Sequence, residues 1–293
     1  MRITTQSIYN TLLTGIRNQM QIQSEGTEQI SSGRRFSRPS QDGVAYTTSL
    51  NIRHAQSGIE ASLGAINKAK LRLGISANTL TEIVPIMQRA EFLAVQQSNA
   101  TLSASQRQTA SIEVTALQNQ LISLANTAFE GEALFAGTAT DVQAIQIDGS
   151  GDAIYQGNTQ DRTVALTPAQ NIVSNVRADH TAFTQAFASL KSLKDSLTAN
   201  NQLNIQASID LISSASNAMV GLNAEVGGKL SSLAIRENTF LGMEMQMQIQ
   251  LSQHESVDMA EVATRLAQSE TSLKAAYAEV AKFNQLSLVN FLR

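Results

Sequence analysis

The sequence predicts a mainly α-helical protein, an elongated helical bundle with paired N- and C-terminal coiled-coil helices and a small β-rich insert. Three observations lead to this fold class. Apolar residues recur at alternating steps of three and four near both ends of the 293-residue chain. Proline (3 residues) and aromatic residues (4%) are scarce, which argues against a β-sandwich with many turns. Glycine recurs between residues 132 and 176, where the helical period gives way to short apolar runs.

The two ends carry weakly apolar helical stripes. The N-terminal stripe consists of Tyr9, Leu13, Ile16, Met20, Gln23, Thr27 and Ile30. The C-terminal stripe consists of Val262, Leu266, Ser269, Leu273, Ala276, Val280, Phe283 and Ser287. Because polar residues interrupt both stripes, neither helix is expected to be stable alone. We expect the ends to pack against each other or against neighbouring copies.

Local signals divide the first half of the chain. Gly33 is a natural helix stop, and Ser40 or Asp42 can cap a long second helix after a basic loop. Pro85 is expected to kink that helix. Its apolar stripe comprises Ile59, Leu63, Ile66, Lys70, Leu73, Ala77, Leu80, Val84, Met87, Glu91 and Ala94. Ser103 or Ser105 can cap a third helix that ends near residues 129–131. The apolar positions expected in that helix are Ile112, Leu117, Leu121, Leu124 and Ala128.

The second half begins with the insert. Runs at 144–147 and 163–166 predict strands, and residues 148–151 predict a tight turn. Helical periodicity returns near Arg177, breaks at residues 200–201, and changes register at 254–257. The glycine pair at 227–228 predicts a bend or a close backbone approach. The apolar positions of these helices include Phe183, Phe187, Leu190, Leu193, Leu197, Ile205, Ile209, Ile212 and Met219.

Composition excludes several classes of function. The formal net charge is −3 and the isoelectric point is about 5.7, so no attraction to nucleic acid or to an anionic membrane is expected. The absence of cysteine excludes disulfides and thiolate chemistry. No apolar leader and no run of about 20 apolar residues is found. If the chain leaves the cell, we expect a route that reads no cleaved leader.

Catalytic constellations are missing as well. The three histidines, His54, His180 and His254, lie far apart in the sequence. The run from Asp148 to Asp152 resembles the start of a calcium loop, but Ala153 replaces the required glycine and Thr159 the final glutamate. We therefore expect no enzymatic activity, no metal and no cofactor. Two further groups suggest packing or subunit contacts instead: Arg34, Arg35, Arg38, and Met243, Met245, Met247.

Several short motifs, taken together and in order, resemble the flagellin-like family. Residues 29–35 (QISSGRR) resemble the end of the first flagellin helix, and residues 39–42 (PSQD) resemble the hook-associated branch. Residues 124–127 (LANT), 134–138 (LFAGT) and 155–158 (YQGN) with Arg162 are similar to the branch that forms the hook–filament junction, as are residues 257–261 and 286–292. Gly43, Gln41 and Glu132–Ala133 depart from the pattern of that branch.

The resemblance implies a structural subunit of the bacterial flagellum, secreted by the flagellar type III apparatus and located at the hook–filament junction. The implied partners are other copies of the chain in a ring-like oligomer, the first hook-associated protein, flagellin and an export chaperone. The alternative within the family is a flagellin that builds the filament. The alternative from another class is a coiled-coil scaffold or a secreted enzyme with helical arms, which would need a cluster of catalytic residues in the insert.

The resemblance also implies a division of the chain and a set of interface residues. Residues 1–38 and 256–293 would form a terminal coiled-coil domain that is disordered in the free monomer. Residues 39–131 and 177–255 would form a helical bundle, and residues 132–176 the insert. The candidate residues for contacts between subunits are Tyr9, Leu13, Ile16, Met20, Ile30, Arg34, Arg35, Val262, Leu266, Leu273, Val280, Phe283, Leu286 and Leu288.

Overall fold

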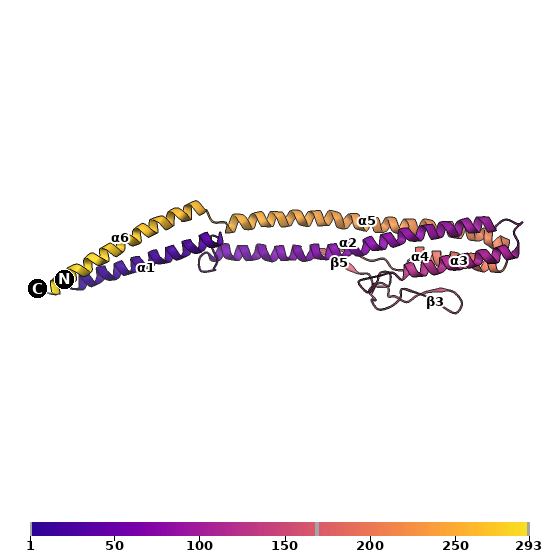
Figure 1. The fold of residues 1–293 in the computed structure, drawn as a ribbon, viewed down its shortest axis with the longest axis horizontal. Coiled ribbons are helices and arrows are strands. Elements are labelled where there is room, and N and C mark those ends of the chain that lie inside the picture. Colours follow the sequence, from indigo (N-terminus) through magenta and orange to yellow (C-terminus); the bar gives the residue numbers. More distant parts are fainter. Residues whose placement is uncertain (1, 168–169, 292–293) are drawn as a thin grey trace. The chain divides into compact units, whose positions relative to one another are not determined.

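The structure, a computed structural model, describes residues 2–167 and 170–291, and side chains at 7–165 and 171–282. It confirms the mainly helical fold class with a small insert of β-hairpins (Figure 1). The helices are α1 (Arg2–Ser32), α2 (Gly43–Gln97), α3 (Ala104–Ala125), α4 (Thr181–Thr198), α5 (Gln202–Glu255) and α6 (Met259–Phe291). The strands are β1 (Ala128–Phe129), β2 (Glu132–Ala133), β3 (Ile145–Ile147), β4 (Ala153–Tyr155), β5 (Thr163–Thr167) and β6 (Gln170–Val173).

The chain forms two compact units. One comprises Met1–Gly58 with Met243–Arg293, and the other Ile59–Gly242. The long helices α2 and α5 each contribute residues to both units, and the insert belongs to the second. The division between 38 and 39 and between 255 and 256 that the sequence suggests stays a prediction.

Local capping signals explain where α1, α2 and α3 begin and end. Gly33 follows α1 with a φ of +67°, the left-handed conformation that glycine adopts without strain. Asp42 caps α2, since its Oδ1 accepts a hydrogen bond from Ala45 N at 2.9 Å. Ser103 caps α3 in a reciprocal capping box with Gln106. The helix α2 continues through Pro85.

The prediction for the end of α3 was wrong. The helix ends at Ala125, because the Asn126 side chain bonds both the N–H and the C=O of Ile145, each at 2.8 Å. The residues expected to be helical instead form the β1–β2 hairpin. Its turn residues, Glu130 and Gly131, both have positive φ, as a primed two-residue hairpin turn requires.

The predicted apolar face of α3 was also partly wrong. Ile112 is 66% exposed, whereas the buried face includes Arg107, Ser111 and Gln118. The Arg107 guanidinium donates hydrogen bonds to the carbonyls of Gln97 and Asn99 and to Asn200 Oδ1. These contacts tie the α2–α3 and α4–α5 connections together, so a polar residue lies inside where a hydrophobic stripe was expected.

The glycine pair of α5 causes no close backbone approach. Gly227 and Gly228 lie inside the continuous helix, and no other segment that the structure describes has an atom within 4 Å of the position a Cβ would take at either residue. Of the two alternatives predicted for this pair, the close approach was therefore wrong, and the bend stays a prediction. The predicted break near 254–257 is confirmed, because α5 ends at Glu255 and α6 begins at Met259.

The second unit contains most of the apolar core. The α2 stripe predicted from Ile59 to Ala94 is buried or half-buried at every position. Phe135 of the insert and Phe183 of α4 are fully buried with ring centroids 5.3 Å apart, which fixes the insert to the bundle. The other large, fully buried side chains of this core are Ile66, Leu73, Leu80, Ile83, Met87, Leu121, Leu134, Leu190, Leu193 and Leu197.

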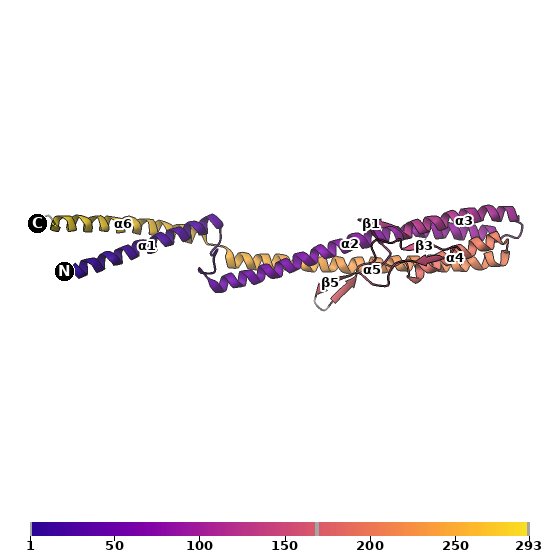
Figure 2. The same ribbon diagram turned by 90° about the horizontal axis from the view of Figure 1, so that it is seen from below.

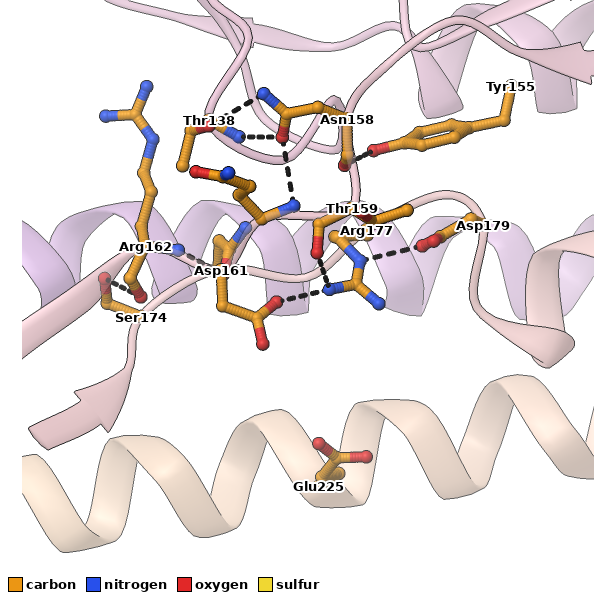
Figure 3. A network of polar contacts seen from close by, with 12 residues as sticks. Thr138, Tyr155, Asn158, Thr159, Asp161, Arg162, Ser174, Arg177, Asp179 and Glu225 are labelled. Atoms are coloured by element: carbon orange, nitrogen blue, oxygen red, sulfur yellow. Dashed lines mark hydrogen bonds and ion pairs between the residues drawn. The ribbon is translucent and has the colours of Figure 1, made fainter.

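The described part of residues 128–173 contains three antiparallel strand pairs, β1–β2, β3–β4 and β5–β6, and the first pair begins just before the predicted insert. Figure 2 labels one strand of each pair. The predicted turn at 148–151 joins β3 to β4, and Gly151 N donates to Asp148 O at 3.0 Å. A polar network holds the loops between the hairpins, as Figure 3 shows. Asn158 Oδ1 accepts from Thr138 N at 2.9 Å, and Arg177 pairs with both Asp161 and Asp179.

Candidate subunit interface

The paired terminal helices α1 and α6 form the centre of the candidate interface. They run alongside each other in the first unit, joining segments from opposite ends of the chain (Figure 1). Ile16 of α1 and Val262 and Leu273 of α6 are buried in this pairing. The sequence prediction that the two ends pack against each other is thus confirmed.

Small and polar residues bring the two helices close. A Cβ at Gly26 would lie 2.9 Å from Leu266 Cδ2, so glycine allows that leucine to sit against the α1 backbone. Ser269 is buried, and its hydroxyl donates to Gln19 O at 3.1 Å. The interface therefore combines modest apolar burial with close helix contact.

Several apolar side chains of the α1–α6 pair are exposed to solvent. Met20 is 53% exposed and Ile30 is 37% exposed, while the ring of Tyr277 is half exposed and its hydroxyl lies 3.9 Å from Met20 Sδ. Ile8 and Ile22 are exposed on α1 as well. A pair with open apolar side chains offers surface for a further protein contact.

The structure brings part of the candidate set together. Ile16, Val262 and Leu273 are buried, and four further candidates are half-buried: Tyr9, Leu13, Leu266 and Val280. Met20, Ile30, Arg34 and Arg35 are exposed. The side chains of Phe283, Leu286 and Leu288 lie outside the described residues.

The loops at the base of the pair are joined by backbone hydrogen bonds. Arg35 N donates to Glu255 O at 2.7 Å, and Val257 N donates to Gly33 O at 3.2 Å. Arg34 and Ser256 form an isolated antiparallel bridge. These bonds fix the α1–α2 loop to the α5–α6 loop.

Glu255 forms ion pairs with two arginines at the loop crossing, the place where the α1–α2 loop meets the α5–α6 loop. It is buried, and the Arg53 guanidinium binds its two carboxylate oxygens at 2.7 and 2.6 Å. Arg34 Nε lies 3.6 Å from Glu255 Oε2. A bidentate arginine–carboxylate pair has strong directional preference, so Glu255 orients Arg53 against the loop.

The other two loop arginines pair locally. Arg38 pairs with Glu28, and Arg35 lies 3.4 Å from Asp42. The hydrogen bond from Ser37 and the contacts with Arg38 hold the pKa of Glu28 below its usual value. Phe36 is buried beside Tyr46 in an edge-on contact with ring centroids 6.4 Å apart. The basic loop is therefore an ordered element.

Sequence reasoning missed several residues of this site, among them Gly26, Gln19, Arg53 and Glu255. Gly26 and Gln19 contact α6 through a missing Cβ and a backbone carbonyl, neither of which an apolar pattern detects. Glu255 was not singled out, because both of its arginine partners, Arg34 and Arg53, lie far from it in the sequence. The regular spacing that includes Met20 and Ile30 suggested a continuous buried stripe, but both side chains are exposed, and α6 also contacts α1 at Gln19 and Gly26.

The described residues contain no group of three or more His, Asp or Glu side chains that could hold a metal ion. Among the described helices, none combines the length and the apolar composition that a membrane-spanning helix requires. The three histidines are exposed, and His180 Nδ1 accepts a hydrogen bond from Ala182 N at the start of α4.

The sequence of this chain is similar to those of several known proteins. Residues 3–140 match the family described as bacterial flagellin N-terminal helical region. The chain is 25% identical over 317 residues to flagellar hook-associated protein 3 of Salmonella typhimurium, and the match covers 100% of both. Flagellin A of Vibrio cholerae is 30% identical over 136 residues, which covers 46% of this chain and 36% of that protein.

Solved structures share the fold. A putative flagellar hook-associated protein from Vibrio parahaemolyticus superimposes with a TM-score of 0.66 at 20% identity, covering 74% of this chain and 100% of that one. The flagellar junction protein from Legionella pneumophila superimposes with a TM-score of 0.58 at 16% identity, covering 70% and 100%.

Paired terminal helices, a helical core with a hairpin insert and a flagellin-type N-terminal region define a flagellin-like protein. Similarity to hook-associated protein 3 runs through the whole chain, whereas similarity to flagellin A covers less than half of it. Over its whole length the chain is therefore similar to flagellar hook-associated protein 3, and its N-terminal region is similar to that of flagellin.

Proposed function

We propose that the chain is a structural, non-enzymatic subunit of the hook–filament junction of the bacterial flagellum, where it adapts the hook to the flagellin filament. The observation that carries this proposal is the pairing of the two chain ends in α1 and α6, which leaves apolar side chains open on both helices. Full-length similarity to hook-associated protein 3 supports the junction over the filament.

The first unit is open to contact beyond the terminal pair. Val44 at the start of α2 is 82% exposed, and Leu50 on the same helix is half exposed. On α5, Met243, Met245 and Ile249 are also exposed. Burying apolar surface is the main favourable contribution to protein association, so these residues suit packing against other copies in the axial structure.

The proposal includes specific partners in the axial structure. Copies of the chain form a ring, with the first hook-associated protein on the hook side and flagellin on the filament side. Residues 1–38 and 256–293 form a terminal domain that orders on assembly, because the small apolar contact between α1 and α6 gives weak stability to long helices alone. An export chaperone holds the C-terminal helix before secretion by the flagellar type III route.

A seeded polymerisation assay tests the proposal. Hooks capped by the first hook-associated protein are mixed with the purified full-length chain, followed by flagellin, and viewed by electron microscopy. A junction subunit adds one short collar that then accepts flagellin. Long filaments of the chain alone would instead support the flagellin alternative, and an absence of binding to the hooks would contradict both.

A further inference from the structure

A small, partly open cavity with a mixed polar and apolar lining lies at the loop crossing of the first unit. Its volume is about 110 Å³, which is space for a few water molecules at about 30 Å³ each or for the carboxylate end of an acidic side chain. The cavity lies between the loop after α1, the start of α2 and the end of α5. Its lining includes Arg34, Phe36, Tyr46, Ser49, Arg53 and Glu255.

The charges in this lining do not balance. Arg34 and Arg53 supply two guanidinium groups, and Glu255 supplies the only carboxylate among the described lining residues. Arg53 already binds both oxygens of that carboxylate. Arg34 has one ion-pair contact among the described residues, at 3.6 Å, which is longer than a charge-assisted hydrogen bond. One cation at the cavity is therefore only weakly paired.

A buried hydroxyl in the same lining also lacks a partner. Ser49 is 3% exposed, and its Oγ has no hydrogen-bond partner among the described residues. Buried polar groups in proteins are nearly always hydrogen-bonded, so an unpaired hydroxyl at a cavity indicates that an acceptor or donor belongs there. A group with negatively charged oxygen atoms could accept hydrogen bonds from both Arg34 and Ser49.

From this geometry we infer that the cavity receives an acidic side chain, Asp or Glu, from a neighbouring copy of the chain. This inference rests on the proposed function, which places copies side by side. The chain carries a net charge of −3, so each copy has carboxylates to offer. Arg34, with its side chain 50% exposed, binds the incoming carboxylate, and Arg53 and Glu255 keep the cavity in shape.

Arginine-to-lysine substitution and zero-length cross-linking test the inference. Arg34→Lys keeps the charge and introduces an amine that a carbodiimide couples only to a carboxylate in contact. Assemblies grown on hook seeds from a mixture of unlabelled and ¹⁵N-labelled copies are cross-linked and analysed by mass spectrometry. The expected product joins position 34 to an Asp or Glu of a differently labelled copy.

Arg35→Lys is the matched control. Arg35 neighbours Arg34 and is similarly exposed, but it pairs with Asp42 and does not line the cavity. It should yield only products within one copy. Assemblies in which position 34 couples only to Glu255 of its own copy, or in which both variants couple equally between copies, would overturn the inference.

Arg34→Gln provides a second readout. The backbone hydrogen bonds that join the α1–α2 loop to the α5–α6 loop do not involve the Arg34 side chain, so both loops should keep their fold. We expect Arg34→Gln to need about a tenfold higher chain concentration for half-maximal incorporation, because one charge-assisted hydrogen bond is lost. Arg34→Lys, which keeps the charge, should restore incorporation. Unchanged incorporation of Arg34→Gln would contradict the contact at the cavity but leave the proposed function untouched. Failure of the unmodified chain to add to seeds contradicts the proposed function and with it this inference.

Discussion

The Tyr155 hydroxyl at the end of β4 donates a hydrogen bond to Asn158 O at 2.8 Å (Figure 3). Burial, together with the charge of Asp179, raises the pKa of Tyr155 to about 12. Because the neutral form is favoured in the folded state, its contribution to stability is complete below pH 10 and is lost as the pH rises towards 12.

We expect an absorbance titration of the folded chain to show the Tyr155 hydroxyl ionising near pH 12. Tyr155→Phe should remove that step. A titration of the unmodified chain with no step near pH 12, or a step there that survives in Tyr155→Phe, would show that the hydroxyl is not held as described.

Gly26 is the residue on which the close contact of α1 and α6 depends. In Gly26→Val the new Cβ would meet Leu266 at 2.9 Å, and overpacking of this kind costs about 1–3 kcal/mol. We expect weaker incorporation into seeded assemblies, by roughly tenfold.

The matched control for Gly26→Val is Gly15→Val on the same helix, where no atom of another described segment lies within 4 Å of the new Cβ. The control carries the same small gain in helix propensity, because valine is a better helix former than glycine. Equal incorporation of the two variants would argue against close packing at Gly26.

At the scale of single elements, the start of α3 offers a direct comparison of two serines. Ser103 accepts from Gln106 N and completes a capping box, whereas Ser105 lies exposed in the first turn. We expect Ser103→Ala to lower the free energy of unfolding by about 1 kcal/mol, and Ser105→Ala by a few tenths at most. Urea unfolding of both variants checks this, and a larger effect at Ser105 would reverse the assignment.

Elements with local causes could be predicted from the sequence. Gly33, Asp42 and the turn after Asp148 act through their own neighbours, and the α2 stripe follows a regular period. Partners distant in the sequence could not be predicted. The end of α3 depends on the contact of Asn126 with Ile145 in the insert, and its buried face depends on the contact of Arg107 with Asn200.

The candidate site shows the same limit. The C-terminal stripe from Val262 to Val280 is buried or half-buried, because its spacing is regular and its neighbour is a single helix. The N-terminal stripe holds to Ile16, after which Gly26 rather than Thr27 contacts α6. A glycine contributes no apolar side chain to a pattern, although Gly26 lets Leu266 lie against the backbone of α1.

At the scale of the whole molecule, the two compact units suit different tasks. The second unit buries a large apolar core with the insert fixed to it by Phe135, and is expected to fold without neighbours. The first unit contains the terminal pair, whose buried apolar contact is small, while exposed apolar side chains occur in both units, such as Met20 in the first and Phe92 in the second. The central claim is that the chain ends are the device for assembly and that the rest is a stable body.

Removal of residues 1–38 and 256–293 tests this claim most directly. The truncated chain and the full chain are compared by circular dichroism and by seeded assembly under the electron microscope. The account predicts a soluble, helical and cooperatively unfolding core that no longer adds to hook seeds. A truncated chain that still forms collars, or one that is unfolded, would contradict it.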